Sequence, residues 1–201
     1  LVARPDADRA HAMALPGGYV YITRGMLRKL DNEAQFAAVL SHEVAHIAKK
    51  HGMDNFKKVM GFQLVLIGIS SFLGDSESSK KTGKIATAVA GIGFNLALLG
   101  YGRDNELESD KLGTVYMFRA GYDPDGMIQL VDILKNIEKR EPSSLEVFFQ
   151  SHPKTADRAA IVQKQYDEIK TFPEYPGTVG KFYPERYQEN VKVNLPAEEK
   201  K

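Results

Sequence analysis

The segment His42-Glu43-Val44-Ala45-His46 sets the strongest limit on how this chain can fold. It lies within residues 31–50, where apolar side chains recur at helical spacing and predict a helix that is buried along one side. Histidines four residues apart share a helix face, so both rings can reach one ion, with Glu43 beside them. The segment therefore predicts a metal-binding helix around which the rest of the chain must pack.

Both ends of this helix are marked in the sequence. Asn32 and Gln35 have the spacing of a capping box, and Gly52 is a suitable glycine just beyond the last turn. His51 follows His46 by five residues, which places it on a different face of a continuous helix. We interpret His51 as a helix-end histidine that the helix dipole favours.

A complete site needs a further ligand. The chain has no cysteine, so zinc would need histidine and carboxylate ligands, three of them from the protein in a catalytic site. On a helix predicted over residues 104–119, Glu106 and Asp110 share a face, while Glu108 points elsewhere. Glu106 can bind zinc there and Asp110 can hydrogen-bond an imidazole. The alternative is an ordinary solvated helix face.

Length and charge bound the remaining possibilities. The 201 residues suffice for one domain with a sizeable core, which we expect over residues 1–170, followed by an irregular C-terminal tail over 171–201. The 27 basic and 26 acidic residues nearly cancel, which argues against nucleic acid as a partner. The chain begins at Leu1 with a polar stretch, and we expect a processed chain from which any signal peptide has been removed.

Two apolar runs, 59–74 and 85–100, flank a polar linker and are shorter than a membrane-spanning helix requires. One interpretation of 59–100 is an apolar helical hairpin, inserted in the domain, that packs on the core or on a partner protein. The other is a hairpin that dips into a membrane, with the flanking lysines near lipid headgroups.

Weaker patterns predict the other elements. A strand follows the Pro-Gly-Gly turn at 16–18, and Asp123-Pro124 begins a helix that continues to about residue 139. Pro153 suits the first position of a fifth helix, which would place His152 at the helix entrance and Arg158 further along it. In a cleft, either side chain could stabilise an oxyanion, and His152 could instead occupy the fourth metal position at rest. The alternative is a turn histidine and a surface arginine.

Four ordered motifs, at residues 15–25, 42–46, 103–110 and 151–158, resemble the HtpX and CAAX-prenyl-protease family of zinc metallopeptidases, and most of all its BepA-like members of bacterial envelopes. The resemblance implies an α+β, predominantly helical, zincin-like (gluzincin-type) domain with a small β-sheet and an active-site helix bearing His-Glu-x-x-His. The sequence departs from the family pattern at His11, Gly102 and Ser109, where Asn, Ser and Ala are usual.

The resemblance also implies roles and a function. Glu43 would be the general base, one zinc ion per chain would bind His42, His46 and Glu106, and Asp110 would support an imidazole. His152 and Arg158 would belong to the active site. The expected activity is that of a zinc-dependent metalloendopeptidase that hydrolyses peptide bonds of protein substrates in the bacterial periplasm or envelope, for protein quality control. The alternative is a protease-like chaperone or scaffold with a structural or blocked zinc site.

An exposed strand edge suggests how a substrate would bind. Gly17, Gly18 and Tyr19 begin the predicted strand, and an edge strand can pair with an extended peptide backbone without reading its side chains. The alternative role is simply to complete a small sheet, and the two are compatible.

Overall fold

The structure is a computed structural model that describes residues 9–15, 17–58, 60–61, 101–140, 142–152, 158–174 and 180–197. Apart from residues 60–61, the apolar hairpin expected over 59–100 lies outside the described residues. Pro153, from which a fifth helix was expected to begin, also lies outside them. Among the helices that the structure describes, none combines the length and apolar character needed to cross a bilayer.

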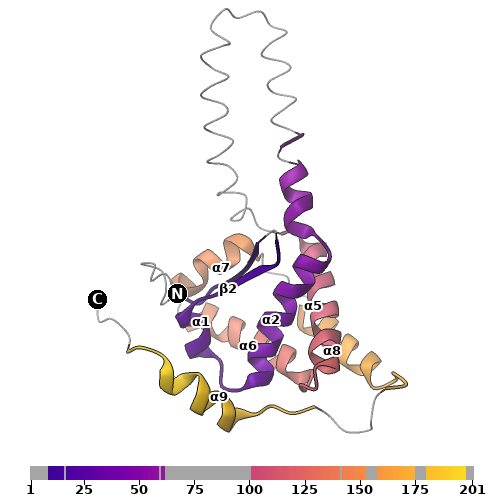
Figure 1. Cartoon of the computed structure of the whole chain (residues 1–201). Coiled ribbons are helices and arrows are strands. Elements are labelled where there is room, and N and C mark those ends of the chain that lie inside the picture. Colours follow the sequence, from indigo (N-terminus) through magenta and orange to yellow (C-terminus); the bar gives the residue numbers. More distant parts are fainter. Residues whose placement is uncertain are drawn as a thin grey trace, which may run out of the picture.

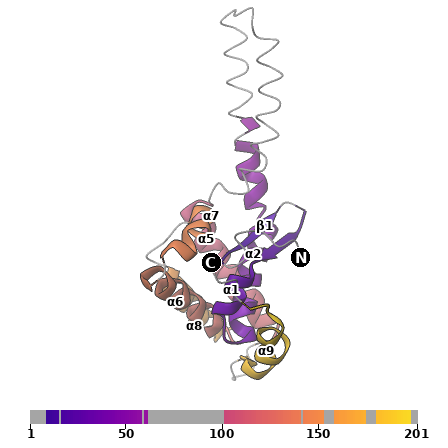
Figure 2. The same ribbon diagram turned by 90° about the vertical axis from the view of Figure 1, so that its left-hand side faces the viewer.

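A central helix, α2 (Glu33–Ala48), packs against a two-stranded sheet and mainly against two of the other helices, α5 (Arg103–Arg119) and α6 (Asp125–Arg140) (Figures 1 and 2). The sheet pairs β1 (Ala12–Leu15) with β2 (Tyr19–Ile22), and α1 (Arg24–Lys29) connects it to α2. The remaining elements are the 3-10 helix η1 (Pro142–Leu145), α7 (Glu146–Ser151), α8 (Arg158–Ile169), α9 (Pro184–Asn190) and the 3-10 helix η2 (Lys192–Asn194). The predominantly helical α+β class is confirmed.

The strand after the Pro-Gly-Gly turn is confirmed as β2, but β1 before the turn was not predicted. The strands are antiparallel, with register from Ala12 opposite Ile22 to Leu15 opposite Tyr19. Gly17 and Gly18 form the turn with φ of 98° and 90°, a conformation that residues with a Cβ rarely adopt. The motif thus folds as a hairpin rather than as one strand.

Glycines allow the helices to approach α2 closely. A Cβ added at Gly113 of α5 would lie 3.0 Å from the backbone nitrogen of His42, and one added at Gly126 of α6 would lie 2.7 Å from the carbonyl of Ala34. The distance at Gly126 is shorter than real Cβ contacts, and the distance at Gly113 is tighter than nearly all of them. Because glycine has no side chain, these two positions allow α5 and α6 to pack close to α2.

The C-terminal segment corrects one expectation. Residues 171–201 are not irregular throughout, because α9 and η2 lie within them and pack on the domain. Tyr187 of α9 is fully buried in the core, and its hydroxyl donates to the carbonyl of Leu27 at 2.8 Å. Pro184 at the first position of α9 fits a helix start, but a seven-residue helix carries too little periodicity to be recognised beforehand.

The capping box at the start of α2 is present in modified form. The Asn32 side chain accepts from the Gln35 N–H at 2.9 Å, and the Gln35 side chain accepts in return from Asp31 N–H at 2.7 Å, one residue earlier than in the usual motif. The other end of α2 differs from the prediction. The helix stops at Ala48, and Lys50, not Gly52, takes the left-handed conformation with φ of 59°.

Lys50 should therefore carry measurable backbone strain. We expect Lys50→Gly to raise the free energy of unfolding by about 0.5 kcal/mol, because relief of the left-handed conformation is partly offset by the chain entropy of glycine. Lys50→Val should lower it by about 1 kcal/mol, because a β-branched side chain fits this conformation poorly. Urea unfolding of both variants measures the difference, and equal midpoints would show that the turn does not hold Lys50 in this conformation.

Candidate metal centre

Three elements bring four metal-binding side chains together in the interior. His42 and His46 come from α2, Glu106 from α5, and His152 from the residue that ends α7. One donor atom from each lies within 4.8 Å of the others, and all four side chains are buried. The predicted cluster of two histidines and Glu106 is thus assembled, with His152 as a fourth member.

The hydrogen bonds of the two α2 histidines orient their rings. Nδ1 of His42 lies 2.9 Å from Oδ1 of Asp110, and Nδ1 of His46 lies 3.0 Å from Nδ1 of His51. In each ring Nε2 faces inward, and the two Nε2 atoms are 3.0 Å apart. If each Nδ1 carries the proton of its ring, two nitrogen lone pairs face each other, which is the arrangement that a cation between them stabilises.

The spacing of the donor atoms fits a tetrahedral ion. Nε2 of His42 lies 3.5 Å from Oε2 of Glu106, and Nε2 of His46 lies 3.3 Å from Oε1 of Glu106. Nδ1 of His152 lies 3.1 Å from Oε1 of Glu106 and 3.4 Å from Nε2 of His42. Zinc–ligand bonds of 2.0–2.1 Å at tetrahedral angles imply donor separations of about 3.3 Å. Nitrogen and carboxylate donors at these distances fit zinc without rearrangement of the backbone.

The charges around the cluster keep its carboxylates ionised. Burial alone would raise the pKa of Glu106, but the imidazoles of His152, His42 and His46 hold it well below its usual range. Burial likewise opposes ionisation of Asp110, and the Arg158 guanidinium and the His42 ring lower its pKa. Both groups are therefore available as anions.

His42 and His46 differ in their affinity for protons. Burial alone would lower the pKa of His42, but its contacts with Asp110 and Glu106 outweigh burial and raise it to about 10. Burial and the neighbouring positive charge of His42 and His152 lower the pKa of His46 to about 3, although Glu106 acts against them. Without an ion, a proton thus resides on His42 rather than on His46.

Glu43 lies beside the cluster with one oxygen available. The side chain is almost completely buried, and within the described part of the chain Oε2 has no hydrogen-bond partner. Oε1 lies 3.4 Å from Nε2 of His152, which is an ion-pair distance, although Nε2 makes no hydrogen bond to any residue that the structure describes. A buried carboxylate oxygen of this kind can accept a proton from a group placed in the cluster.

Arg158 makes its closest contacts with Asp110. Its Nε and Nη2 each donate to one oxygen of that carboxylate at 2.7 Å, and its Nη1 lies 3.7 Å from Glu106. A bidentate pair of this kind fixes both partners. Arg158 therefore orients Asp110, which in turn orients His42.

His152 is the C-cap residue of α7. Its N–H donates to the carbonyl of Phe148 at 2.8 Å as the C-cap of α7, and its ring stacks on the Phe148 ring. The next described helix, α8, begins at Arg158. The helix expected to begin at Pro153 falls on residues 153–157, outside the described residues, whereas α7, which was not foreseen, brings His152 to the metal cluster.

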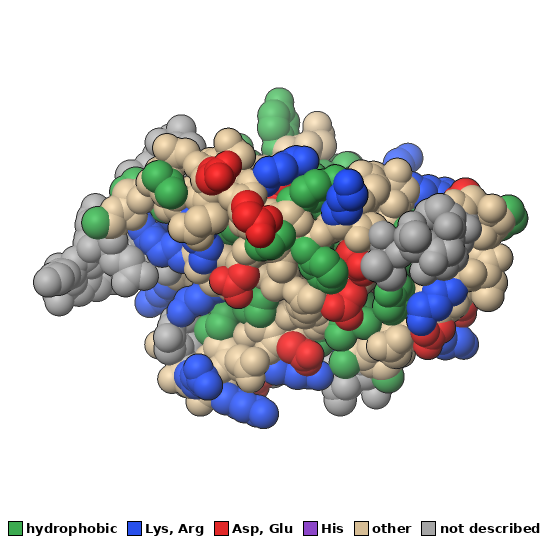
Figure 3. Space-filling view, turned by 90° about the horizontal axis from the view of Figure 1, so that it is seen from below, with side chains coloured by type: hydrophobic (Ala, Val, Ile, Leu, Met, Phe, Trp, Pro, Cys, Tyr) green, Lys and Arg blue, Asp and Glu red, His purple; other side chains and the backbone are tan. Residues whose placement is uncertain are grey.

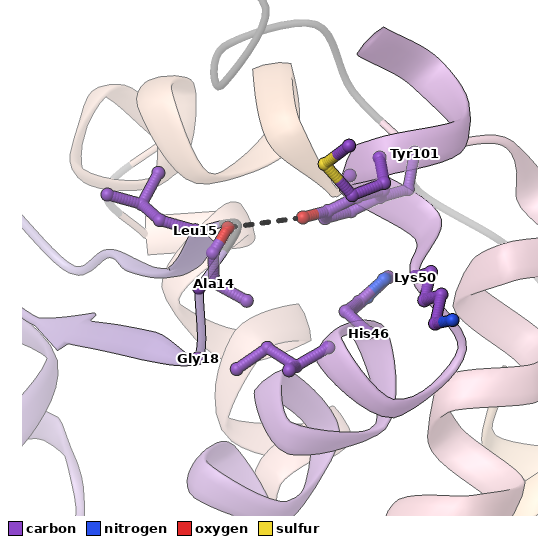
Figure 4. A pocket seen from close by; sticks show the side chains of 10 residues that line it. Ala14, Leu15, Gly18, His46, Lys50 and Tyr101 are labelled. Atoms are coloured by element: carbon purple, nitrogen blue, oxygen red, sulfur yellow. Dashed lines mark hydrogen bonds between the residues drawn. The ribbon is translucent and has the colours of Figure 1, made fainter. Parts of the chain in front are cut away.

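A pocket of about 380 Å³ opens beside His46, between the hairpin turn and the end of α2 (Figure 4). Gly17 and Gly18 line it, whereas Tyr19 is not among its lining residues and is 64% exposed. Tyr101 closes one side, with its ring stacked on His46 at a centroid distance of 3.8 Å and its hydroxyl donating to Ala14 at 3.4 Å. The pocket therefore connects the hairpin to a candidate ligand.

His11 occupies the strand side of the same region. It is buried against Phe148, and within the described part of the chain neither ring nitrogen has a hydrogen-bond partner. Burial and the nearby His152 lower its pKa to about 4, so the ring is neutral near pH 7. His11 belongs to the wall of the site and not to its donor set.

The opposite face of the domain gives a contrast. Basic and acidic side chains are interspersed on the face drawn in Figure 3, and no histidine of the described residues is visible on it. This mixture agrees with the near-zero net charge of the sequence. The candidate metal-binding side chains lie in the interior, around α2.

Removal of one donor tests this site. We expect Glu106→Gln to lower the zinc content of the purified chain well below one ion, because a neutral amide replaces an anionic ligand. Asp104→Asn, at an exposed position on the same helix, is the matched control and should retain the metal. Elemental analysis after purification without chelator measures both, and equal contents would show that Glu106 is not a ligand.

Comparisons with known proteins agree with this geometry. The chain is 24% identical over 169 residues to the "Beta-barrel assembly-enhancing protease" of Yersinia pestis, covering 83% of this chain and 34% of that protein. It is 27% identical over 160 residues to the "Mitochondrial metalloendopeptidase OMA1" of Schizosaccharomyces pombe, covering 80% and 44%. The chain thus spans less than half the length of these relatives. The model of peptidase family M48 matches residues 1–165, and the chain belongs to this family.

Proposed function

We propose that the chain is a zinc-dependent metalloendopeptidase that hydrolyses peptide bonds of protein substrates. The observation that carries the proposal is the buried tetrahedral donor set with the free oxygen of Glu43 beside it. A site that only stabilises the fold has no use for an additional buried carboxylate. Membership of a metallopeptidase family supports the same reaction.

Each residue has a distinct task in this proposal. His42, His46 and Glu106 would hold the zinc, which would acidify a water molecule and polarise a peptide carbonyl. Glu43 accepts the proton of that water through its unpartnered Oε2 and can pass it to the departing amine. Asp110, held by Arg158, keeps the Nδ1 proton of His42 in place so that Nε2 faces the metal.

The open edge of β1 is where we propose that a substrate backbone binds. Hydrogen-bonded and non-hydrogen-bonded residue pairs alternate along an antiparallel ladder, and the N–H of Thr23, directly after β2, donates to the carbonyl of His11. Ala12 and Ala14 therefore direct their backbone groups away from β2. The Tyr101 hydroxyl already bonds the carbonyl of Ala14, as a substrate N–H would. Gly17 and Gly18 allow close approach at the turn, and Tyr19 lies at its outer side.

Replacement of the base tests the mechanism. Glu43→Gln keeps the size of the side chain but cannot accept a proton, so it should retain zinc and lower cleavage of an unfolded protein by about 10²–10⁴-fold. Zinc content and thermal stability of the variant serve as controls. Cleavage at the parental rate would contradict the proposed role of Glu43.

His152 gives the site a resting state. We propose that its Nδ1 would be the fourth ligand of a bound ion, because this atom lies among the donors and the ring is completely buried. A substrate would have to displace it. Once displaced, the ring would be close enough to stabilise an oxyanion, so the two roles of His152 can follow one another.

The two roles predict opposite effects of one substitution. His152→Ala should raise protein cleavage if the resting ligand limits access, and should lower it by about 10²–10³-fold if oxyanion stabilisation dominates. We expect the increase, measured as kcat/KM with zinc content matched between variant and parent. An unchanged rate would remove His152 from the site.

A protease-like chaperone or scaffold is the second candidate function. It is favoured by the enclosure of the cluster, since Glu43, Glu106 and His152 are all inaccessible in the described structure. For this candidate, neither Glu43→Gln nor His152→Ala would change any activity on protein substrates. An envelope location, a role in protein quality control, and contact of residues 59–100 with a membrane or partner are proposals that rest on the relatives and on the sequence.

A further inference from the structure

His51 contacts the candidate metal ligand His46, although its spacing in the sequence does not predict this contact. On a continuous helix, residues five apart diverge, but α2 stops at Ala48 and Lys50 takes the left-handed conformation. The chain then resumes as a helix over residues 51–58. This break turns His51 back towards α2, so that its Nδ1 lies 3.0 Å from Nδ1 of His46.

A carboxylate lies at the other end of the His51 ring. Nε2 of His51 is 3.1 Å from Oε2 of Glu108, and the other oxygen of Glu108 is 2.5 Å from Nζ of Lys49. His51 is buried, whereas Glu108 and Lys49 are 42% and 43% exposed. His46, His51 and Glu108 thus form a row from the metal cluster to the surface, which we call the His51 relay.

The chemistry of the relay allows one arrangement of protons when an ion is bound. A metal on Nε2 of His46 leaves the proton of that ring on Nδ1, so Nδ1 of His46 donates and Nδ1 of His51 accepts. The proton of His51 must then be on Nε2, where the Glu108 carboxylate accepts it. In this arrangement each hydrogen bond of the row pairs one donor with one acceptor.

We propose that the His51 relay is a positioning device that fixes the ring of His46 and its tautomer for metal binding. The inference rests on the proposed metal site and adds residues that neither the spacing of the motif nor the donor cluster identifies. Nδ1 of His42 contacts the buried Asp110 directly, whereas Nδ1 of His46 reaches a carboxylate only through a second imidazole. The two histidines of one motif are thus held by different means, one internal and one connected to the surface.

Metal affinity is the direct readout of the relay. We expect His51→Leu to weaken zinc binding by about 10–100-fold, the usual effect of losing a hydrogen-bond partner behind a ligand. His51→Gln should recover most of the affinity, because its amide oxygen can accept from His46 and its NH₂ can donate to Glu108. Glu108→Ala should have a smaller effect in the same direction, since the His51 ring remains.

The measurement is competition with a chromophoric chelator on the full chain, together with the visible spectrum of the cobalt-substituted protein. A distorted ligand geometry changes the cobalt spectrum, whereas a loss of fold stability alone does not. Glu189→Ala, an exposed glutamate on α9, is the matched control for Glu108→Ala and should bind zinc like the parent. Unfolding of the metal-free variants is followed in parallel.

The outcomes separate this inference from the proposed function. His46→Ala should abolish tight zinc binding, and retention of zinc by that variant would overturn the metal site itself. If His46→Ala loses zinc while His51→Leu binds it with parental affinity and spectrum, the site stands and the relay is wrong. Equal losses in His51→Leu and His51→Gln would also overturn the relay, because the effect would then not depend on the hydrogen bonds.

Discussion

A buried cluster of charge is the constraint on which the rest of this structure depends. Three carboxyl groups, those of Glu43, Glu106 and Asp110, lie in the interior, and among the described residues Arg158 is the buried guanidinium that faces them. Uncompensated buried charge is costly. Arg158 supplies one positive charge, and a divalent cation held by the cluster would supply two more. Without the cation, histidine must take up protons, as the raised pKa of His42 indicates.

This cluster requires α2 and α5 to lie unusually close. Gly113 contacts the backbone at His42, and Glu106 and Asp110 come earlier on the same helix, on the face that covers α2. α5 therefore cannot be a typical amphipathic helix, because its inward face carries carboxylates where a core helix has apolar side chains. α6 supplies the apolar face instead, with Leu130, Leu134 and Ile137 in the core.

The sequence predicted the parts of the site that follow helical spacing and missed those that depend on where helices end. Spacing paired His42 with His46 and Glu106 with Asp110, because residues four apart share a face. The family resemblance joined the two pairs, and the structure brings them together. His51 was misassigned because the break at Lys50 is not marked by glycine. The polar residues Lys49 and Glu108 can be assigned a role near His51 only once the turn at Lys50 is known.

The short elements β1 and α7 could not be predicted from the sequence for a similar reason. β1 is four residues long and contains no β-branched or aromatic residue, so only its pairing with β2 identifies it as a strand. The short α7 ends at Ser151, and its C-cap His152 stacks on Phe148 one turn earlier, so a helix that was not predicted directs that ring to the cluster. Periodicity in the sequence predicts which face of a helix or strand a residue occupies. Tertiary contacts determine where that helix or strand ends.

The described conformation is closed over the metal cluster and open beside it. His152 covers the donors from α7, whereas the pocket lined by His46, Gly17 and Gly18 is open next to them. Tyr101 joins the two regions, since its ring stacks on His46 and its hydroxyl bonds Ala14 at the edge of β1. For the proposed peptidase, a peptide that pairs with β1 must take the place of the Tyr101 hydroxyl, and its carbonyl must take the place of His152. Substrate binding and opening of the site would therefore be the same event, which would restrain the enzyme until an extended chain is present.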